Sequence, residues 1–109
     1  MKKLLLLCLL SSIFVVAQAQ EKWVAPKEAK SLISPLTNND TVLKEGKKTY
    51  TKTCVVCHGP KGKGNGVAAA AMNPKPVNFS KSEVQEQTDG ELFWKLSHGK
   101  GMMVAFKES

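Results

Sequence analysis

The chain contains no arginine, so all 16 of its cationic side chains are lysines. Arginine is the residue that proteins favour for clamping phosphates and for reading base edges through paired hydrogen bonds. The lysines are also not clustered with interleaved aromatic residues. These two absences argue against a nucleic-acid-binding protein. The net charge of +7 leaves two roles for the lysines, either a solvated surface or a positive rim that steers docking onto an acidic partner protein.

No hydrophobic run reaches the length of about 20 residues that a membrane-spanning helix needs. The apolar run over residues 4–17 follows a short basic opening and ends at Ala17-Gln18-Ala19. This order is typical of a secretory signal peptide. We therefore expect residues 1–19 to be removed on export to the periplasm, with no membrane span afterwards. An uncleaved anchor is the alternative. Cys8 lies within the run, preceded by leucines, which disfavours lipidation.

The sequence also lacks internal repeats, coiled-coil heptads and the alternation of apolar and polar residues that is typical of strands. These absences predict an all-α fold. Residues 20–109 are expected to form one small domain, near the size at which side chains alone make a marginal core. A large buried apolar group would supply much of the missing apolar surface.

Two of the three cysteines lie in the run Cys54-Val55-Val56-Cys57-His58, which is the attachment signature of c-type haem. Two thiols on one helical turn can each add to a vinyl group of the porphyrin, forming two thioether bonds. The adjacent imidazole can then bind the iron from its proximal side. The motif therefore predicts one covalently bound haem c.

Other chemistries are compatible with a C-x-x-C-H run. A zinc site needs two more ligands, and only Cys8 and His98 remain in the sequence. A thioredoxin-like dithiol normally lies in a βαβ pattern, which is missing here. A non-haem dithiol or metal-binding module is therefore the rival from another class.

Prolines, glycines and helix-capping residues divide the rest of the chain into segments. Residues 20–39 are expected to form an extended N-terminal arm with at most a short helix. Asp40 is the expected N-cap of a helix over residues 41–52. Gly46 costs this helix about 1 kcal/mol relative to alanine, which is most simply explained by another helix crossing closely there.

The segment after the motif is predicted to be a loop and then a capped helix. Residues 59–66 are rich in glycine, which would let the backbone pass close to a bulky planar group. Residues 67–72 are expected to form a turn of helix. Thr88 and Glu91 match a capping box that opens a helix through Ser97. Its apolar stripe is expected to pack in the core, in contact with the porphyrin, and consists of Leu92, Phe93 and Leu96.

These features resemble the class I c-type cytochromes, most closely the small single-haem bacterial ones of the cbb3-oxidase-subunit-III type. The resemblance covers roughly residues 42–106. It is carried by Gly46, Tyr50, the residues 54–59, Gly62, Gly64, Gly66, Pro76, Phe79, the residues 89–94, Gly99 and Met103. It implies that Cys54 and Cys57 attach the haem, that His58 is the proximal iron ligand, and that a methionine is the distal ligand. It also implies a one-electron carrier rather than an enzyme, with respiratory complexes or other cytochromes as partners.

The distal ligand has to be chosen between adjacent methionines. In the family the ligating methionine is usually followed by proline, a small residue and an aromatic one. Met103-Val104-Ala105-Phe106 keeps that frame except for Val104, which favours Met103. Met102 and His98 are the alternatives. A labile or open sixth position would instead suit gas sensing or weak peroxidase activity. The backbone carbonyl of Pro74 or Pro76 is expected to accept a hydrogen bond from the ring nitrogen of His58 that does not bind iron.

The sequence departs from the family at its end. Class I cytochromes normally close with a C-terminal helix that crosses the first helix near a glycine and an aromatic residue. Here Gly46 and Tyr50 would lack that partner, because the sequence stops at Ser109. We therefore expect a cytochrome c domain over residues 40–109 that is C-terminally incomplete, through truncation or because a partner supplies the missing surface.

Overall fold

A computed structural model describes residues 22–107 of the chain. These residues form four α-helices and two 3₁₀ helices, and their only β feature is an isolated bridge between Lys100 and Met103. In chain order the elements are η1 (Lys27–Ser31), α1 (Asp40–Thr53), α2 (Val55–His58), η2 (Ala69–Ala71), α3 (Ser82–Gln85) and α4 (Asp89–His98). The predicted all-α fold is confirmed. The predicted signal peptide lies outside the described residues. Over residues 22–107, every helix is too short or too polar to be a candidate membrane span.

Helix α1 begins one residue earlier than the sequence suggests. The side chain of Asn39 accepts a hydrogen bond from the backbone N–H of Val42 at 3.0 Å and is the N-cap. Asp40 is the first helical residue, where its carboxylate faces the positive end of the helix dipole. The prediction of Asp40 as N-cap was therefore wrong, because two cap-forming residues stand side by side and Asn39 takes the role.

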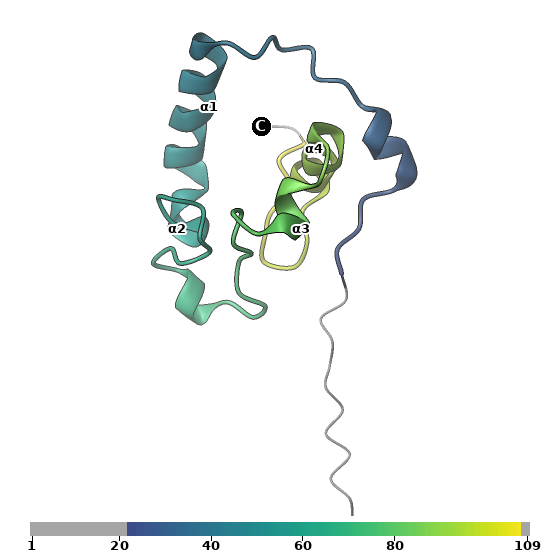
Figure 1. Ribbon diagram of the computed structural model, residues 1–109. Coiled ribbons are helices and arrows are strands. Elements are labelled where there is room, and N and C mark those ends of the chain that lie inside the picture. Colours follow the sequence, from purple (N-terminus) through teal and green to yellow (C-terminus); the bar gives the residue numbers. More distant parts are fainter. Residues whose placement is uncertain (1–21, 108–109) are drawn as a thin grey trace, which may run out of the picture.

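No helix of the described residues crosses α1 at Gly46. A Cβ atom added to Gly46 would meet nothing within 4 Å, and α1 has no buried residue. The close crossing predicted from this glycine is therefore not found in residues 22–107. The reason is that α2, which continues α1 at its C-terminal end, is the only described helix that α1 contacts. In Figure 1, α1 and α2 lie on one side of the molecule, and α4 lies on the other.

Helix α4 has the predicted capping box. The hydroxyl of Thr88 accepts from the N–H of Glu91 at 3.2 Å, and the carboxylate of Glu91 accepts from the N–H of Thr88 at 2.9 Å. The helix runs one residue beyond the predicted end, to His98. Its apolar stripe is not packed in a core, because Phe93 is 63% exposed and Leu96 is 43% exposed.

Apolar burial in the described residues is confined to small side chains. The buried apolar residues are Ala25, Ala29, Ala69 and Val84, and none of the larger side chains in this range is fully buried. Many large apolar side chains lie open, including Leu43, Val56, Val67, Phe93 and Val104. The helices therefore form a shell that has apolar surface but little core of its own.

Candidate functional site

The two thiols and the imidazole of the haem-attachment motif lie on one helical turn. Helix α2 follows α1 through Cys54, whose N–H donates to the carbonyl of Tyr50 at 2.8 Å. The N–H of His58 donates to the carbonyl of Cys54 at 2.9 Å, closing the turn. Cys54 and Cys57 are both free thiols and both half-buried. The structure thus brings together the three residues that the motif singled out.

The protonation state of Cys54 bears on the dithiol alternative. Burial raises the pKa of the Cys54 thiol above its usual value, and the neighbouring Cys57 adds to the effect. Catalytic C-x-x-C dithiols have the opposite property, since they attack as thiolates and have lowered pKa values. This environment therefore does not favour a redox dithiol at Cys54.

An aromatic neighbour orients the His58 ring. The imidazole stacks on Phe79, with 4.5 Å between ring centroids and an angle of 23° between the ring planes. Phe79 in turn meets Tyr50 edge-on at 6.4 Å, and the Tyr50 hydroxyl donates to the carbonyl of Gly59 at 2.6 Å. The N–H of Phe79 donates to the carbonyl of Gly62 at 2.8 Å. The sequence indicates Phe79 and Tyr50 only through the family resemblance, because the contact between Phe79 and His58 joins residues that are far apart in the sequence.

The second ring nitrogen of His58 does not have the partner predicted for it. Nδ1 is buried and makes no hydrogen bond within residues 22–107, so neither Pro74 nor Pro76 accepts from it. Burial lowers the pKa of His58, while interaction with the backbone of Val77 opposes this shift. Lowering the pKa favours the neutral imidazole, which is the form that binds metals. The expected proline carbonyl is wrong because the chain after Pro76 brings Val77 to the ring instead.

The glycine-rich loop winds tightly over the end of α2. The N–H groups of Gly64 and Gly66 donate to the carbonyls of His58 and Cys57, at 2.9 Å and 3.0 Å. A Cβ atom on Gly66 would lie 2.3 Å from the carbonyl oxygen of Val56, so any side chain would force the loop away. Gly66 therefore serves a close approach to the α2 backbone, whereas Gly64 serves a close approach to the backbone of Pro76. The bulky planar group that the sequence led us to expect is, at Gly62, the Phe79 ring.

The two methionines lie in a loop that folds back on the end of α4. Lys100 and Met103 exchange two backbone hydrogen bonds of 3.0 Å, and the N–H of Phe106 donates to the carbonyl of Leu96 at 2.9 Å. Met103 is half-buried, whereas Met102 is 63% exposed. The loop thus holds the two side chains in different environments.

His98 lies at the exposed C-terminal end of α4. Its ring stacks on Trp94 at 4.2 Å between centroids, with 20° between the ring planes, and its Nδ1 lies 2.7 Å from the carbonyl oxygen of Trp94. Both contacts attach the ring to its own helix. Residues 22–107 contain no group of three or more His, Cys, Asp or Glu side chains that could hold a metal ion.

The residues present fit a covalently bound haem. Within residues 22–107 they supply two free thiols on one turn, an adjacent imidazole, and large apolar side chains that lie exposed. A porphyrin is a large flat apolar group, so it suits this combination. Burying such surface stabilises a protein by roughly 25 cal/mol per Å².

The family comparison agrees with this chemistry. A model of the family described as cytochrome c oxidase, cbb3-type, subunit III, matches residues 41–109. None of the curated proteins compared with the chain matches it significantly. The matched domain is that of a c-type cytochrome, which transfers electrons and contains covalently bound haem c with its iron. Because the match covers more than half of the chain, the protein belongs to the cbb3-type cytochrome c oxidase subunit III family of c-type cytochromes.

Proposed function

We propose that the protein is an exported periplasmic carrier that transfers one electron at a time and is not an enzyme. The observation that carries the proposal is the placement of two free thiols, Cys54 and Cys57, on one turn beside His58. Bound haem would supply the redox couple, because its iron alternates between the ferrous and ferric states. The two cysteines form the thioethers, and His58, held by its stacking on Phe79, is the proximal ligand.

Met103 is the proposed distal ligand. Its half-buried position and its backbone pairing with Lys100 support this choice over the exposed Met102. Methionine sulfur favours the ferrous state, so His/Met ligation raises the reduction potential above that of a bis-histidine site. An iron with six ligands also has no free position for a substrate, which suits a carrier.

The proposed organisation follows from the same assignment. Residues 1–19 are a signal peptide that is removed near Ala19, residues 20–39 precede the cytochrome domain, and residues 40–109 form it. The partners are respiratory complexes or other cytochromes. The lysine-rich surface would steer docking onto acidic patches of such partners, with an association rate that falls as salt rises.

A second candidate is a haem c with a labile sixth position, suited to gas sensing or weak peroxidase chemistry. It is favoured by the openness of the distal loop, where Met102 and Val104 are each 63% exposed. Fast binding of carbon monoxide to the ferrous protein would support this candidate. No binding would favour the carrier.

The first experiment is expression with a cytochrome c maturation system, followed by a pyridine haemochrome assay and optical spectra. We expect a two-thioether haem c spectrum, with the far-red band that sulfur ligation gives ferric iron. Met103→Ala should remove this band, and the matched variant Met102→Ala should keep it. Cys54→Ala with Cys57→Ala should abolish covalent haem. A colourless wild-type protein would contradict the proposal and support a non-haem dithiol or metal-binding module.

A further inference from the structure

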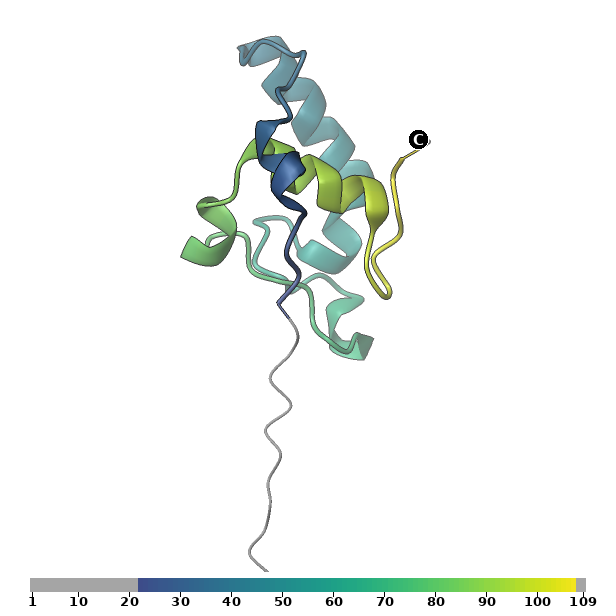
Figure 2. The same ribbon diagram turned by 90° about the vertical axis from the view of Figure 1, so that its right-hand side faces the viewer.

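The N-terminal segment before the cytochrome domain packs against α4. Ala25 and Ala29 are 5% and 2% exposed, and η1 makes more contact with α4 than with any other element of the described residues. Figure 2 shows η1, in dark blue, crossing α4, in yellow-green. This segment precedes residues 41–109, which match the family, so the contact is an addition to the family domain. We call residues 22–32 the clasp.

Gly90 provides the closest approach between the clasp and α4. A Cβ atom at Gly90 would lie 2.1 Å from the carbonyl oxygen of Ala29 and 2.9 Å from the Cβ of Leu32. Backbone atoms cannot swing aside as a flexible side chain does, so only glycine lets the two segments pack this closely. The clasp side of the contact is also compact, because the side chain of Ala29 is only a methyl group.

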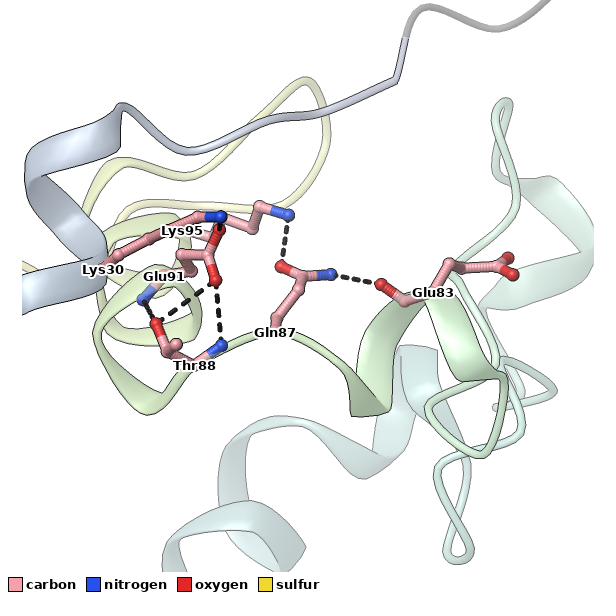
Figure 3. Close-up of polar contacts among 6 residues, drawn as sticks. All are labelled: Lys30, Glu83, Gln87, Thr88, Glu91 and Lys95. Carbon is pink, nitrogen blue, oxygen red and sulfur yellow. Dashed lines mark hydrogen bonds and ion pairs between the residues drawn. The ribbon is translucent and has the colours of Figure 1, made fainter.

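Charged and aromatic groups hold the clasp to two successive turns of α4. Figure 3 shows Lys30 reaching Glu91, with 3.9 Å between its ammonium nitrogen and a carboxylate oxygen. One turn further on, the Lys95 ammonium lies 5.6 Å from the centroid of the Trp23 ring. Burial lowers the pKa of Lys95, while Glu91 opposes this shift. Lys95 also donates to Gln87, which precedes the helix and donates to the backbone carbonyl of Glu83.

Helix α4 leads directly into the loop that holds Met103. The loop is tied to the helix by the bond from the Phe106 N–H to the carbonyl of Leu96, and its own bridge joins Lys100 to Met103. A displacement of α4 therefore moves the base of the loop. A distal ligand binds firmly only when its supporting elements hold it within a fraction of an ångström.

We propose that the clasp is a positioning element for the distal haem ligand. By fixing α4 from the face that carries Gly90, Glu91 and Lys95, it holds the Met103 loop in the place that iron ligation requires. This inference rests on the proposed His/Met ligation, and it adds a role for residues outside the family domain. Its consequence is that releasing the clasp weakens the sixth ligand while leaving the thioethers and His58 in place.

Two variants release the clasp from opposite sides of the contact. Ala29→Asp places a charge in the buried face of the clasp without changing α4. Gly90→Ala places a methyl group against the carbonyl of Ala29. It does not weaken α4 itself, because alanine is more favourable in a helix than glycine by about 1 kcal/mol. The matched controls are Ser31→Asp, at an exposed position of η1, and Gly46→Ala, at the open position of α1. All four are made in the full chain and matured with haem.

The readout is competition for the sixth position. Imidazole is titrated into the ferric protein while the far-red sulfur band is followed. We expect both release variants to bind imidazole about tenfold more tightly than the wild type, and the controls to stay within about twofold, a tenfold change being about 1.4 kcal/mol. Limited proteolysis after Lys27 and Lys30 reports whether the clasp has been released.

The outcomes separate the clasp from the ligand assignment. A clasp that becomes sensitive to protease while imidazole affinity stays at the wild-type value would overturn the inference and leave His/Met ligation standing. A clasp that stays resistant in both release variants would also overturn it, because Ala29 and Gly90 would then not hold the contact. A wild-type protein without the far-red band would refute Met ligation itself, and the clasp would then have no distal methionine to position.

Discussion

The imidazole of His58 owes its orientation to residues that are distant in the sequence. Phe79 stacks on the ring, Tyr50 supports Phe79 from the side, and the Tyr50 hydroxyl fixes the first residue of the glycine loop. The ring itself makes no hydrogen bond through Nδ1 to any described residue. Stacking on Phe79 and interaction with the backbone of Val77 therefore act on this ring, where a proline carbonyl was expected.

Replacing Phe79 should separate the effect of stacking from that of apolar bulk. Phe79→Leu keeps most of the volume and loses the stacking, which is worth about 0.5–1.5 kcal/mol. Phe79→Ala loses both and should cost about 2 kcal/mol, roughly half the cost of truncating a fully buried phenylalanine. Denaturant unfolding of the holoprotein measures both values. The reduction potential should shift in both variants, since each frees the ring of His58, the proposed proximal ligand.

Equal stability and an unchanged potential in Phe79→Leu would show that the stacking does not orient His58. The leucine variant is the more informative of the two, because it leaves the least cavity. A shift in potential without a change in stability would locate the effect at the iron rather than in the fold.

At the scale of elements, α4 is the one helix of residues 22–107 that begins with a capping box. Its N-terminus is closed by the reciprocal bonds of Thr88 and Glu91, and Glu91 also pairs with Lys30 of the clasp. One carboxylate thus connects the cap of the helix with the tertiary contact beside it. Glu91 therefore contributes both to the local cap of α4 and to its contact with the clasp.

The stability of this junction should depend on pH. The backbone N–H of Thr88, which donates to the carboxylate, holds the pKa of Glu91 below its usual value; burial opposes this, while the Thr88 hydroxyl, Lys30 and Lys95 add to it. A carboxyl with a lowered folded-state pKa stabilises the protein above its unfolded-state pKa, about 4.3. That stabilisation is lost as the pH falls through the folded-state pKa.

The measurement is the free energy of unfolding between pH 7 and pH 3 for the wild type and for Glu91→Gln. Glutamine can still accept from the Thr88 N–H but has no charge to titrate. We expect the wild type to be more stable at pH 7 and the difference to shrink below about pH 4.3. A difference that stays constant down to pH 3 would show that the charge of Glu91 contributes nothing to the junction.

The helices that could be predicted from the sequence are those with local signals. The capping box located α4 to within one residue, and the predicted helix over residues 41–52 corresponds to α1. The predicted turn of helix near residues 67–72 is η2. By contrast, the prediction of a helix crossing at Gly46 was wrong for the described residues. A glycine allows another segment to approach closely, but it does not require one.

At the scale of the whole molecule, the described helices bury little apolar surface against one another. Their buried apolar side chains are small, and large apolar side chains such as Leu43, Phe93 and Leu96 lie open. Side-chain burial on this scale is insufficient to offset the conformational entropy of ordering a domain. Attachment of haem is therefore expected to be coupled to folding.

We expect the protein without haem to lack fixed tertiary packing. The test compares holoprotein with the same chain produced without the maturation system, using Cys54→Ala with Cys57→Ala as a second haem-free form. Both haem-free forms should lose the near-ultraviolet circular dichroism signal and a sharp thermal transition, while keeping part of the helical signal. A cooperative transition in either form within about 5 °C of the holoprotein, which corresponds to roughly 1 kcal/mol, would contradict this expectation.

The cofactor chemistry and the local helix signals could be recognised from the amino-acid sequence alone. The spacing of the thiols, the adjacent histidine and the capping box each involve residues close together in the sequence, so they can be identified without knowing the fold. Three contacts became evident only from the folded chain: Phe79 stacks on His58, the backbone of Val77 rather than a proline carbonyl acts on the same ring, and the clasp packs against Gly90. These contacts join segments far apart in the chain, and their formation depends on shape complementarity that no local pattern records.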